Sequence, residues 1–294
     1  MIFVIVGPTG VGKSSLALEY SLKHDALIVN GDVFQCYKEM NIGTAKPPLE
    51  ERKKVPHYLF DIATVTKEYT IYDYQKDLRK TLDELIPLNK DIIIVGGSGL
   101  YLKSSLYDFN LNEVKNKVDM SLYEKMDNET LYKKLQDIDL EASKNIHPNN
   151  RKRVIRAIEI YLESGEKKSD IINKQEHKLL YDVCFIGLSK QREELYSLIN
   201  QRVDKMVEDG LVEEVRSLME QYPTSLRAFQ AIGYKELMES LKTTPLSDII
   251  NLIKQRTRNY AKRQYTYFNH QLPVNWFSSK GDALKFMEEY HAIK

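Results

Sequence analysis

Four residues near the N-terminus have the types and spacing of a phosphate-binding loop. Gly7, Gly12, Lys13 and Ser14 fit the pattern G-x-x-x-x-G-K-[ST], directly after the apolar run IFVIV and before a segment of helical character. The glycines let successive backbone N–H groups turn toward phosphate oxygens, the lysine adds a positive charge, and the serine hydroxyl can bind Mg²⁺. The residues expected to bind a di- or triphosphate are Gly7, Pro8, Thr9, Gly10, Val11, Gly12, Lys13 and Ser14, with Ser14 as the magnesium ligand.

A single carboxylate, Asp32, follows the next apolar run, in the stretch VNGDVFQCYKEMNIGTAKP. An acid at the carboxyl end of a parallel strand faces the same crevice as the phosphate loop. There it can hold Mg²⁺ through water or accept a proton from an attacking nucleophile. An aspartate in Asn-Gly-Asp is also a common turn cap, and this stretch alone leaves both interpretations open.

The elements that must position these residues follow from short apolar runs at 2–6, 26–29, 92–95 and 183–188, which alternate with segments of helical periodicity. This alternation predicts an α/β fold, a P-loop NTPase-like parallel sheet flanked by helices. Residues 110–165 have helix-spaced apolar positions and almost no strand pattern, so we expect a helical insertion domain within a core of residues 1–109 and 166–294. Long helices follow residue 188, the last from about residue 245 to 270.

The bulk composition excludes several classes of protein. The 294 residues include 43 Lys or Arg and 42 Asp or Glu, so any nucleic-acid binding must come from local patches. Cys36 and Cys184 lack the spacing of a zinc site or a disulfide framework, and no other metal-ligand cluster stands out. No apolar run approaches the ~18 residues of a membrane span, so we expect a cytoplasmic protein.

The phosphate loop does not specify the reaction. The run IIIV is followed by Gly96-Gly97-Ser98 where a nucleotide hydrolase often carries an acid, and no Gln or Arg is obviously placed to orient a water. Both features weaken the interpretation of the chain as a nucleotide hydrolase.

Several blocks, in order and spacing, resemble the tRNA dimethylallyltransferases, also called isopentenyl-diphosphate:tRNA transferases. They are GPTGVGKSSLA, VNGDVFQCYKEMNIGTAKP, VPHYLFDI, IIVGGSGLYLKSSL, HPNNRKRVIRAIEIYLESG, QRVDKMVEDGLVEEV, FQAIGYKEL and NYAKRQYTYF. NIGTAKP and AKRQYTYF are far more specific than the phosphate loop. The resemblance implies transfer of a dimethylallyl group from dimethylallyl diphosphate to the N6 amine of adenosine 37 in tRNA, with Mg²⁺ as cofactor and pyrophosphate as the leaving group.

The resemblance also implies catalytic roles. An adenine amine is a weak nucleophile, and Asp32 would accept its proton, a contribution of about 10² to 10⁴ in rate. A family threonine in GGTGLY and an arginine in the RVD helix correspond to Ser98 and Arg202, which would assist at the leaving group. Serine keeps the hydroxyl but lacks the methyl group that restricts its rotamer.

A tRNA-binding surface is implied as well, because a base in an anticodon loop must be turned out of its stack before an enzyme can reach it. Gln35 would read that base, while Val33 replaces the usual family serine and removes one hydroxyl contact. Gly233 would permit close backbone approach. The expected tRNA-binding residues are Asp32, Val33, Phe34, Gln35, Lys152, Arg153, Val154, Ile155, Arg156, Gln230, Ala231, Ile232, Gly233, Tyr234, Lys235, Lys254, Arg258 and Lys262.

The basic residues of the last long helix illustrate the two interpretations of such a patch. Lys254, Arg258 and Lys262 recur at i, i+4 and i+8, so they form one cationic stripe. Such a stripe can follow RNA phosphates or can simply be a solvated helix face, and the family resemblance favours the first. A family arginine between residues 99 and 128 has no secure counterpart, with Lys115 and Lys117 as possible substitutes.

Two other classes of function fit part of the pattern. An ATP-dependent small-molecule kinase of the nucleoside or shikimate type would use the same loop, with Asp32 activating a hydroxyl. A nucleotide-gated RNA-binding module would need no catalytic acid. The basic, Tyr-rich last helix disfavours the kinase and Asp32 disfavours the module, so the expected partners are dimethylallyl diphosphate and a tRNA anticodon stem-loop with A36 and A37. No protein partner or membrane is inferred, and we expect a monomer.

Overall fold

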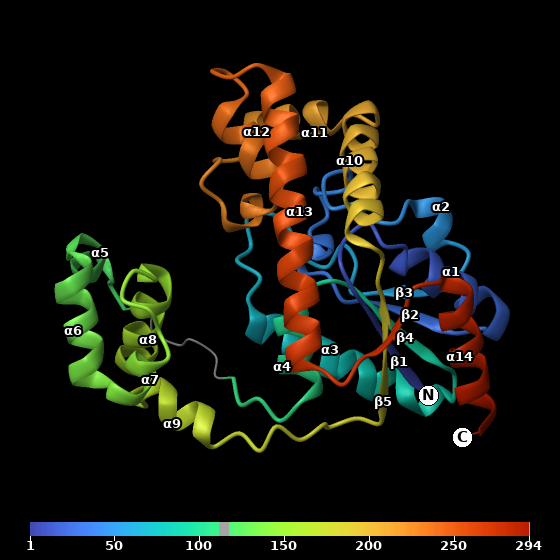
Figure 1. Ribbon diagram of the computed structural model, residues 1–294, viewed down its shortest axis with the longest axis horizontal. Helices are drawn as coiled ribbons and strands as arrows, with labels where there is room; N and C mark the ends of the chain where they lie inside the picture. The colour runs from blue at the N-terminus through green and yellow to red at the C-terminus, as the bar shows by residue number, and fades with distance from the viewer. Residues whose placement is uncertain (112–117, 294) are drawn as a thin grey trace. The chain divides into compact units, whose positions relative to one another are not determined.

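The computed structural model describes residues 1–111 and 118–293 (Figure 1). The chain divides into two compact units. The first, the core unit, combines Met1–Leu106 with the chain from Tyr181 onward, and the second, the insertion unit, is Tyr107–Leu180. Lys115 and Lys117 lie outside the described residues.

The core unit contains a six-stranded sheet in which every pairing is parallel. The strand order is β3 (His57–Tyr58), β2 (Leu27–Asn30), β4 (Ile92–Val95), β1 (Ile2–Val6), β5 (Val183–Leu188) and β6 (Asn275–Phe277). The predicted parallel sheet is confirmed. Four of its strands, β1, β2, β4 and β5, coincide with the four apolar runs of the sequence. The edge strands β3 and β6 were not predicted, since runs of two and three residues are too short to show a strand pattern.

The central strands are apolar throughout because both faces of the sheet are covered. All five residues of β1 are buried, and β1 lies between β4 and β5. Phe3 and Ile5 point to the face that packs against Leu16 of α1 and Met287 of α14, whereas Val4 points to the opposite face. The helices of this unit are α1 (Lys13–His24), α2 (Leu49–Arg52), α3 (Ile71–Leu85), α4 (Gly99–Leu106), α10 (Arg192–Glu208), α11 (Leu211–Gln221), α12 (Tyr234–Ser240), α13 (Leu246–Gln271) and α14 (Lys280–Ile293), with the short 3₁₀ helices η1 (Val33–Cys36), η2 (Ile86–Leu88) and η3 (Arg227–Gln230).

The longest helix of the described chain, α13, confirms the helix predicted from about residue 245 to 270. It packs against α10, α12 and α4. The helix therefore extends from the helices α11 and α12 to the region of α4 beside the sheet (Figure 1). No helix in residues 1–111 and 118–293 combines the length and apolar character needed to cross a membrane.

The insertion unit is helical, with α5 (Ser121–Lys125), α6 (Asn128–Ile138), α7 (Leu140–Lys144), α8 (Arg151–Ser164) and α9 (Lys168–Asn173). Leu131, Leu135, Val154 and Ile158 form the centre of its own apolar core. The compact unit is longer than the range 110–165 expected from the sequence. Ser169 of α9 explains part of the difference, because its N–H and hydroxyl donate to the buried Asp139 carboxylate at 2.9 and 2.7 Å.

Candidate functional site

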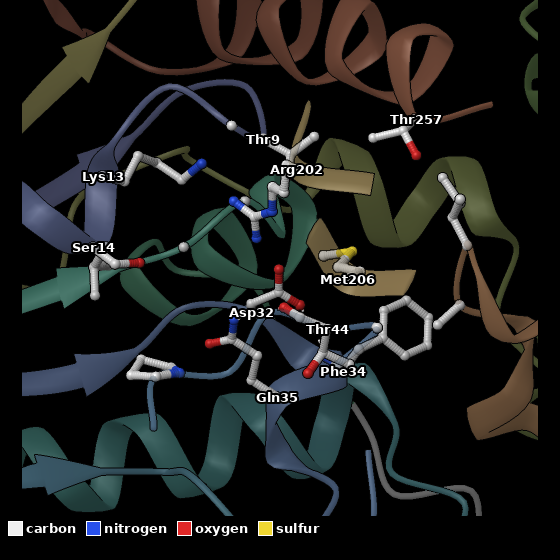
Figure 2. Close-up of a pocket in the computed structure, with 18 of the residues that line it drawn as sticks. Thr9, Lys13, Ser14, Asp32, Phe34, Gln35, Thr44, Arg202, Met206 and Thr257 are labelled. Carbon is white, nitrogen blue, oxygen red and sulfur yellow. Dashed lines mark hydrogen bonds between the residues drawn. The ribbon is translucent and has the colours of Figure 1, made fainter. Parts of the chain in front are cut away.

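Three neighbouring strands end at one cavity. The phosphate loop follows β1, Asp32 follows β2, and Gly96 and Gly97 follow β4, which lies between the other two strands. Parallel strands bring these carboxyl ends to the same edge of the sheet. Together with residues of α10, α13 and the segment 230–233 they line a cavity of about 370 Å³ (Figure 2).

The phosphate loop has the backbone that its glycines predict. Gly7 has a φ of +136°, and a Cβ there would lie 2.4 Å from the Leu188 carbonyl oxygen of the neighbouring strand. Five of the eight predicted residues line the cavity, namely Thr9, Gly10, Gly12, Lys13 and Ser14. The other three predicted residues belong to the same loop but do not line the cavity; they are Gly7, Pro8 and the buried Val11. The loop is therefore built to present its backbone and Lys13 to a ligand.

Lys13 folds back onto its own loop. Its Nζ donates to the carbonyl oxygens of Gly7 and Pro8 at 3.0 and 2.8 Å. Burial, with a further contribution from the Arg202 charge, lowers the pKa of Lys13 to about 7, while Asp32 opposes the shift. An anionic ligand would restore the charged form of this lysine.

Asp32 both caps a turn and lines the cavity. Its Oδ1 caps η1 by accepting the Phe34 N–H at 3.1 Å, and the residue also lines the cavity. The buried Asn30 braces it, since the Asn30 Oδ1 accepts the Asp32 N–H at 2.8 Å and the Nδ2 donates to the Asp32 carbonyl at 2.9 Å. Burial raises the pKa of the Asp32 carboxyl, against the opposing effects of the Phe34 N–H and the charges of Lys13 and Arg202.

Arg202 approaches Asp32 from α10. Figure 2 shows its guanidinium between Lys13 and the Asp32 carboxyl, with Met206 one helical turn further along. Burial lowers the pKa of Arg202 and Asp32 opposes this shift. Lys13 and Arg202 therefore bring two basic side chains to the same part of the cavity as the Asp32 carboxylate, an arrangement that suits a diphosphate.

Ser98 lies behind the cavity wall. Its hydroxyl accepts the backbone N–H of Val33 at 3.1 Å, and both residues are buried. The family resemblance implied that Ser98 assists at the leaving group. In the structure its hydroxyl instead holds the backbone that follows Asp32, which fits a positioning role.

The residues that directly follow Asp32 differ in whether they reach the cavity. Phe34 and Gln35 line the cavity, whereas Val33 is buried away from it. The Gln35 Nε2 donates to the carbonyl oxygens of Thr44 and Ala45 at 3.0 and 3.2 Å. Of the three residues that follow Asp32, Phe34 and Gln35 thus have access to the cavity.

The segment 230–235 is only partly exposed to the cavity. Gln230, Ala231, Ile232 and Gly233 line it, but Tyr234 is fully buried and its hydroxyl donates to the Glu214 carboxylate at 2.5 Å. Lys235 lies beside Glu239 at 3.7 Å. A φ of +97° explains the glycine at 233, since a Cβ there would meet no atom of the described protein closer than 3.8 Å.

The predicted cationic stripe on α13 faces another helix over most of its length. Lys254 pairs with Asp204 at 2.6 Å, and Arg258 donates to Asn200 at 2.7 Å with its guanidinium over the Tyr196 ring. All three partners belong to α10. Lys262 is exposed. Lys254 and Arg258 therefore join α13 to α10, and only Lys262 of the three has the exposure of a free RNA-binding side chain.

The opposite face of α13 contributes cavity residues that were not among the predicted site residues. Thr257, Tyr260, Arg263 and Gln264 line the cavity. Gln264 is buried, and buried positions of a helix are normally occupied by apolar residues. Gln264 lies on the same side of the helix as the buried Ile253 and Ala261. A polar residue at this helical spacing is the feature of the sequence that could have indicated its role.

The basic patch of the insertion unit is also mixed. Lys152 and Arg153 are exposed, and Arg156 bonds Glu159 and Glu163 at 2.7 and 3.4 Å. Ile155 is half-buried against the core of that unit. Val154 is fully buried there, so its side chain cannot contact RNA while this core is intact.

A divalent cation fits the phosphate loop through Ser14. The Ser14 hydroxyl lines the cavity at the start of α1, and Mg²⁺ is usually held by one or two protein oxygens together with substrate phosphates and water. Within the described ranges, no group of three or more His, Cys, Asp or Glu side chains has metal-binding geometry. The donor set therefore suits a cation that arrives with a diphosphate.

The chain is similar in sequence to one family of known proteins over most of its length. A family model described as IPP transferase matches residues 35–271. The chain is 42% identical over 287 residues to a tRNA dimethylallyltransferase of Alkaliphilus metalliredigens, covering 94% of this chain and 91% of that protein. It is 40% identical over 287 residues to a tRNA dimethylallyltransferase of Anoxybacillus flavithermus, covering 96% and 92%.

Two solved structures have the same fold. One is a tRNA isopentenylpyrophosphate transferase from Staphylococcus epidermidis, with a TM-score of 0.74, 37% identity, and coverage of 99% of this chain and 98% of that one. The other is a eukaryotic dimethylallyltransferase acting on tRNA, with a TM-score of 0.82, 30% identity, and coverage of 95% and 74%.

Proposed function

Because the chain belongs to the IPP transferase family, we propose that it transfers a dimethylallyl group from dimethylallyl diphosphate to the N6 amine of adenosine 37 in tRNA. One observation carries the proposal from the structure. The Asp32 carboxylate, the phosphate loop and Arg202 share a single cavity (Figure 2). A diphosphate donor and an acceptor that must lose a proton can meet there.

The donor would bind with its diphosphate on the phosphate loop. The loop N–H groups, Lys13 and Arg202 would stabilise the charge that develops as the allylic carbon–oxygen bond breaks. Mg²⁺ held by Ser14 and the diphosphate would add further positive charge at the leaving group. Apolar cavity residues such as Met206 and Ile232 would enclose the dimethylallyl group and exclude water from it.

The acceptor would enter as an extruded adenine. A new carbon–nitrogen bond forms between the dimethylallyl carbon and N6, and the displaced N6 proton passes to the Asp32 carboxylate. The raised pKa of that carboxyl makes it a better proton acceptor near neutral pH than an ordinary aspartate. The allylic carbon–oxygen bond breaks as the carbon–nitrogen bond forms, and pyrophosphate leaves with the two electrons of the broken bond.

The tRNA itself would be bound by exposed cations. Lys152 and Arg153 of the insertion unit and Lys262 of α13 are suited to contact the phosphates of an anticodon stem-loop with A36 and A37. We propose that the protein works as a monomer, in the cytoplasm where its substrate is found.

The test is transfer of labelled dimethylallyl diphosphate, with Mg²⁺, to unmodified tRNA carrying A36 and A37. We expect label on that tRNA and none on a matched transcript with guanosine at position 37. Phosphorylation of nucleosides or shikimate-like alcohols by ATP, with no label on tRNA, would favour the kinase interpretation instead.

A further inference from the structure

Glu214 lies on the first turn of α11 and points away from its own helix, toward the segment Asn41–Lys46, here called the 41–46 loop. Its Oε2 accepts the N–H groups of Asn41 and Ile42 at 3.2 and 3.0 Å, and its Oε1 lies 3.5 Å from the Gly43 nitrogen. Hydrogen bonds to a charged carboxylate are among the strongest that a backbone makes. Glu214 therefore fixes the start of this loop.

Tyr234 of α12 reinforces the same contact. Its hydroxyl donates to the Glu214 Oε1 at 2.5 Å, and its ring packs so closely on the loop that a Cβ on Gly43 would lie 2.4 Å from a ring carbon. The 41–46 loop is thus seated directly against α11 and α12.

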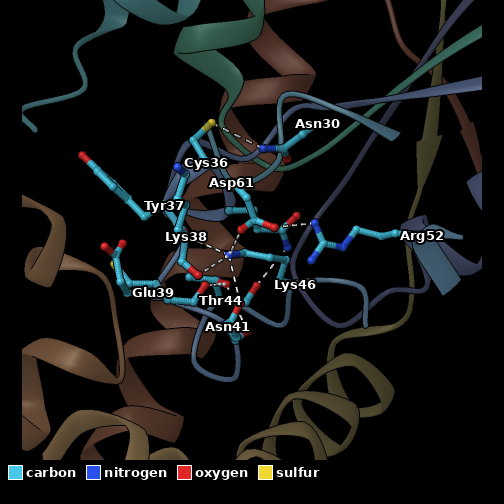
Figure 3. Close-up of polar contacts among 12 residues, drawn as sticks. Asn30, Cys36, Tyr37, Lys38, Glu39, Asn41, Thr44, Lys46, Arg52 and Asp61 are labelled. Atoms are coloured by element: carbon cyan, nitrogen blue, oxygen red, sulfur yellow. Dashed lines mark hydrogen bonds and ion pairs between the residues drawn. The ribbon is translucent and has the colours of Figure 1, made fainter. Parts of the chain in front are cut away.

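The far end of the loop is held by Lys46, whose side chain is almost completely buried. Figure 3 shows its polar contacts. Its Nζ donates to the Tyr37 carbonyl oxygen at 2.6 Å and to the side chains of Asn41 and Asp61 at 3.0 and 2.6 Å. Ala45, next to it, has a φ of +48°, a conformation that alanine rarely adopts. The loop keeps this unfavourable backbone because both of its ends are fixed.

The loop in turn fixes the Gln35 side chain. Its Thr44 and Ala45 carbonyls both take hydrogen bonds from the Gln35 Nε2. A carbonyl oxygen accepts only from a donor, so the amide nitrogen must face the loop and the Oε1 remains to bond a ligand. Gln35 therefore offers the cavity a hydrogen-bond acceptor, beside the Asp32 carboxylate. The amine edge of adenine is a hydrogen-bond donor and matches both groups.

We propose that Glu214 is a positioning residue, which acts through the 41–46 loop to present Gln35 as an acceptor for the amine-bearing edge of the substrate base. The inference rests on the proposed function for the identity of that base. Glu214 does not line the cavity, so its effect on the reaction is indirect, and its bonds to the Asn41 and Ile42 N–H groups connect it to Gln35 through the loop.

The test is a double-mutant cycle that combines Glu214→Gln with Gln35→Ala. Glu214→Gln keeps the size of the side chain but places an NH₂ group among backbone N–H donors. We expect it to lower kcat/KM for the anticodon stem-loop about tenfold, equivalent to about 1.4 kcal/mol. The KM for dimethylallyl diphosphate should stay within about twofold, since the phosphate loop is not involved. In the Gln35→Ala background the same change should cost almost nothing.

Glu213→Gln is the matched control, because Glu213 is the exposed neighbour on the same helix. It should leave both constants unchanged. Should Glu214→Gln prove unstable, Tyr234→Phe removes one contact to the carboxylate and should shift the stem-loop constant in the same direction by a few-fold. Additive losses in the double variant, or equal losses for both substrates, would overturn the proposal.

The cycle separates this inference from the proposed function. Absence of transfer by the wild-type protein would refute the function. The same cycle measured on stem-loop affinity would still decide whether Glu214 acts through Gln35.

Discussion

The backbone N–H of Thr9 donates to the Gln264 side chain at 2.9 Å, which joins the phosphate loop to a residue 255 positions later in the chain. The Nε2 of the same glutamine donates to the Gly97 carbonyl oxygen at 3.1 Å. One buried amide of α13 therefore connects the loop after β1 with the loop after β4. The phosphate loop is held in place from outside as well as by its own glycines.

Replacing Gln264 should impair binding of the diphosphate. Gln264→Leu removes the acceptor for the Thr9 N–H and the donor to Gly97, and a buried unpaired backbone group costs about 1–3 kcal/mol. We expect the KM for dimethylallyl diphosphate to rise about tenfold while stem-loop affinity changes little. Steady-state kinetics with each substrate varied in turn would measure the KM for dimethylallyl diphosphate and the KM for the stem-loop. A larger change in the stem-loop KM would contradict the role of Gln264 in holding the phosphate loop.

Gly97 should tolerate no side chain. A Cβ at this position would lie 2.1 Å from the Gln264 Nε2, so Gly97→Ala must displace the bridging amide. Overpacking of this kind destabilises a fold by about 1–3 kcal/mol. Thermal unfolding should show a lower Tm, together with a raised KM for the diphosphate. Gly281→Ala is the control, because its nearest atom would be 3.5 Å away, and a comparable loss in that variant would argue against a local clash.

Affinity for the diphosphate should depend on pH through Lys13. Its pKa is about 7 without a ligand, and a bound diphosphate favours the ammonium form and raises the pKa, so binding takes up a proton. Affinity should be nearly constant at lower pH and fall as the pH rises above about 7, by at most about tenfold per pH unit. Calorimetry in buffers of different ionisation enthalpy would detect the proton. In Lys13→Arg, which stays charged, the fall should disappear, and persistence of the fall would assign it to another group.

Ser98 should contribute through the backbone after Asp32. Ser98→Ala leaves the buried Val33 N–H without its acceptor, at a cost of about 1–3 kcal/mol, and should lower kcat by displacing Asp32. Ser98→Thr keeps the hydroxyl and should restore most of the rate. If Ser98→Ala instead raised only the KM for dimethylallyl diphosphate, the hydroxyl would contact the bound diphosphate and would not act through the backbone after Asp32.

The two basic patches should respond differently to salt. Ala substitution of the exposed Lys152 and Arg153 should weaken stem-loop binding and reduce the slope of log affinity against log salt by about 0.7–0.9 for each RNA phosphate that is no longer neutralised. Lys254→Ala should alter the slope little, because Lys254 is paired with Asp204. A larger change of slope for Lys254→Ala than for the insertion-unit variants would contradict this prediction, because it would make Lys254 the main phosphate contact.

Local sequence was sufficient to predict the elements that carry contiguous signals. The phosphate loop, the four apolar strands and the helix ending near His270 each have a strong pattern within a short window, and Asp32 follows one of these strands. The short strands β3 and β6 exist only because neighbouring strands pair with them. Their residues carry too little pattern to be recognised in advance.

The missed site residues have a common physical cause. Glu214 and Gln264 act on segments more than 160 residues away. Nothing near Glu214 in the sequence distinguishes it from a surface glutamate, and the only local signal for Gln264 is its helical phase with Ile253 and Ala261. The basic residues Lys254 and Arg258 show the converse, since their spacing is equally typical of an RNA-binding stripe and of a helix–helix contact. Only the packing of α10 against α13 distinguishes the two.

The most direct test of the account is the single-turnover rate of transfer by Asp32→Asn, with stem-loop and dimethylallyl diphosphate already bound. The account predicts a rate lower by a factor of about 10² or more, because the amide cannot accept the N6 proton. Stem-loop affinity should stay within about threefold of the wild-type value. A rate close to that of the wild-type protein, or a loss of binding as large as the loss of rate, would contradict the role of Asp32 as proton acceptor.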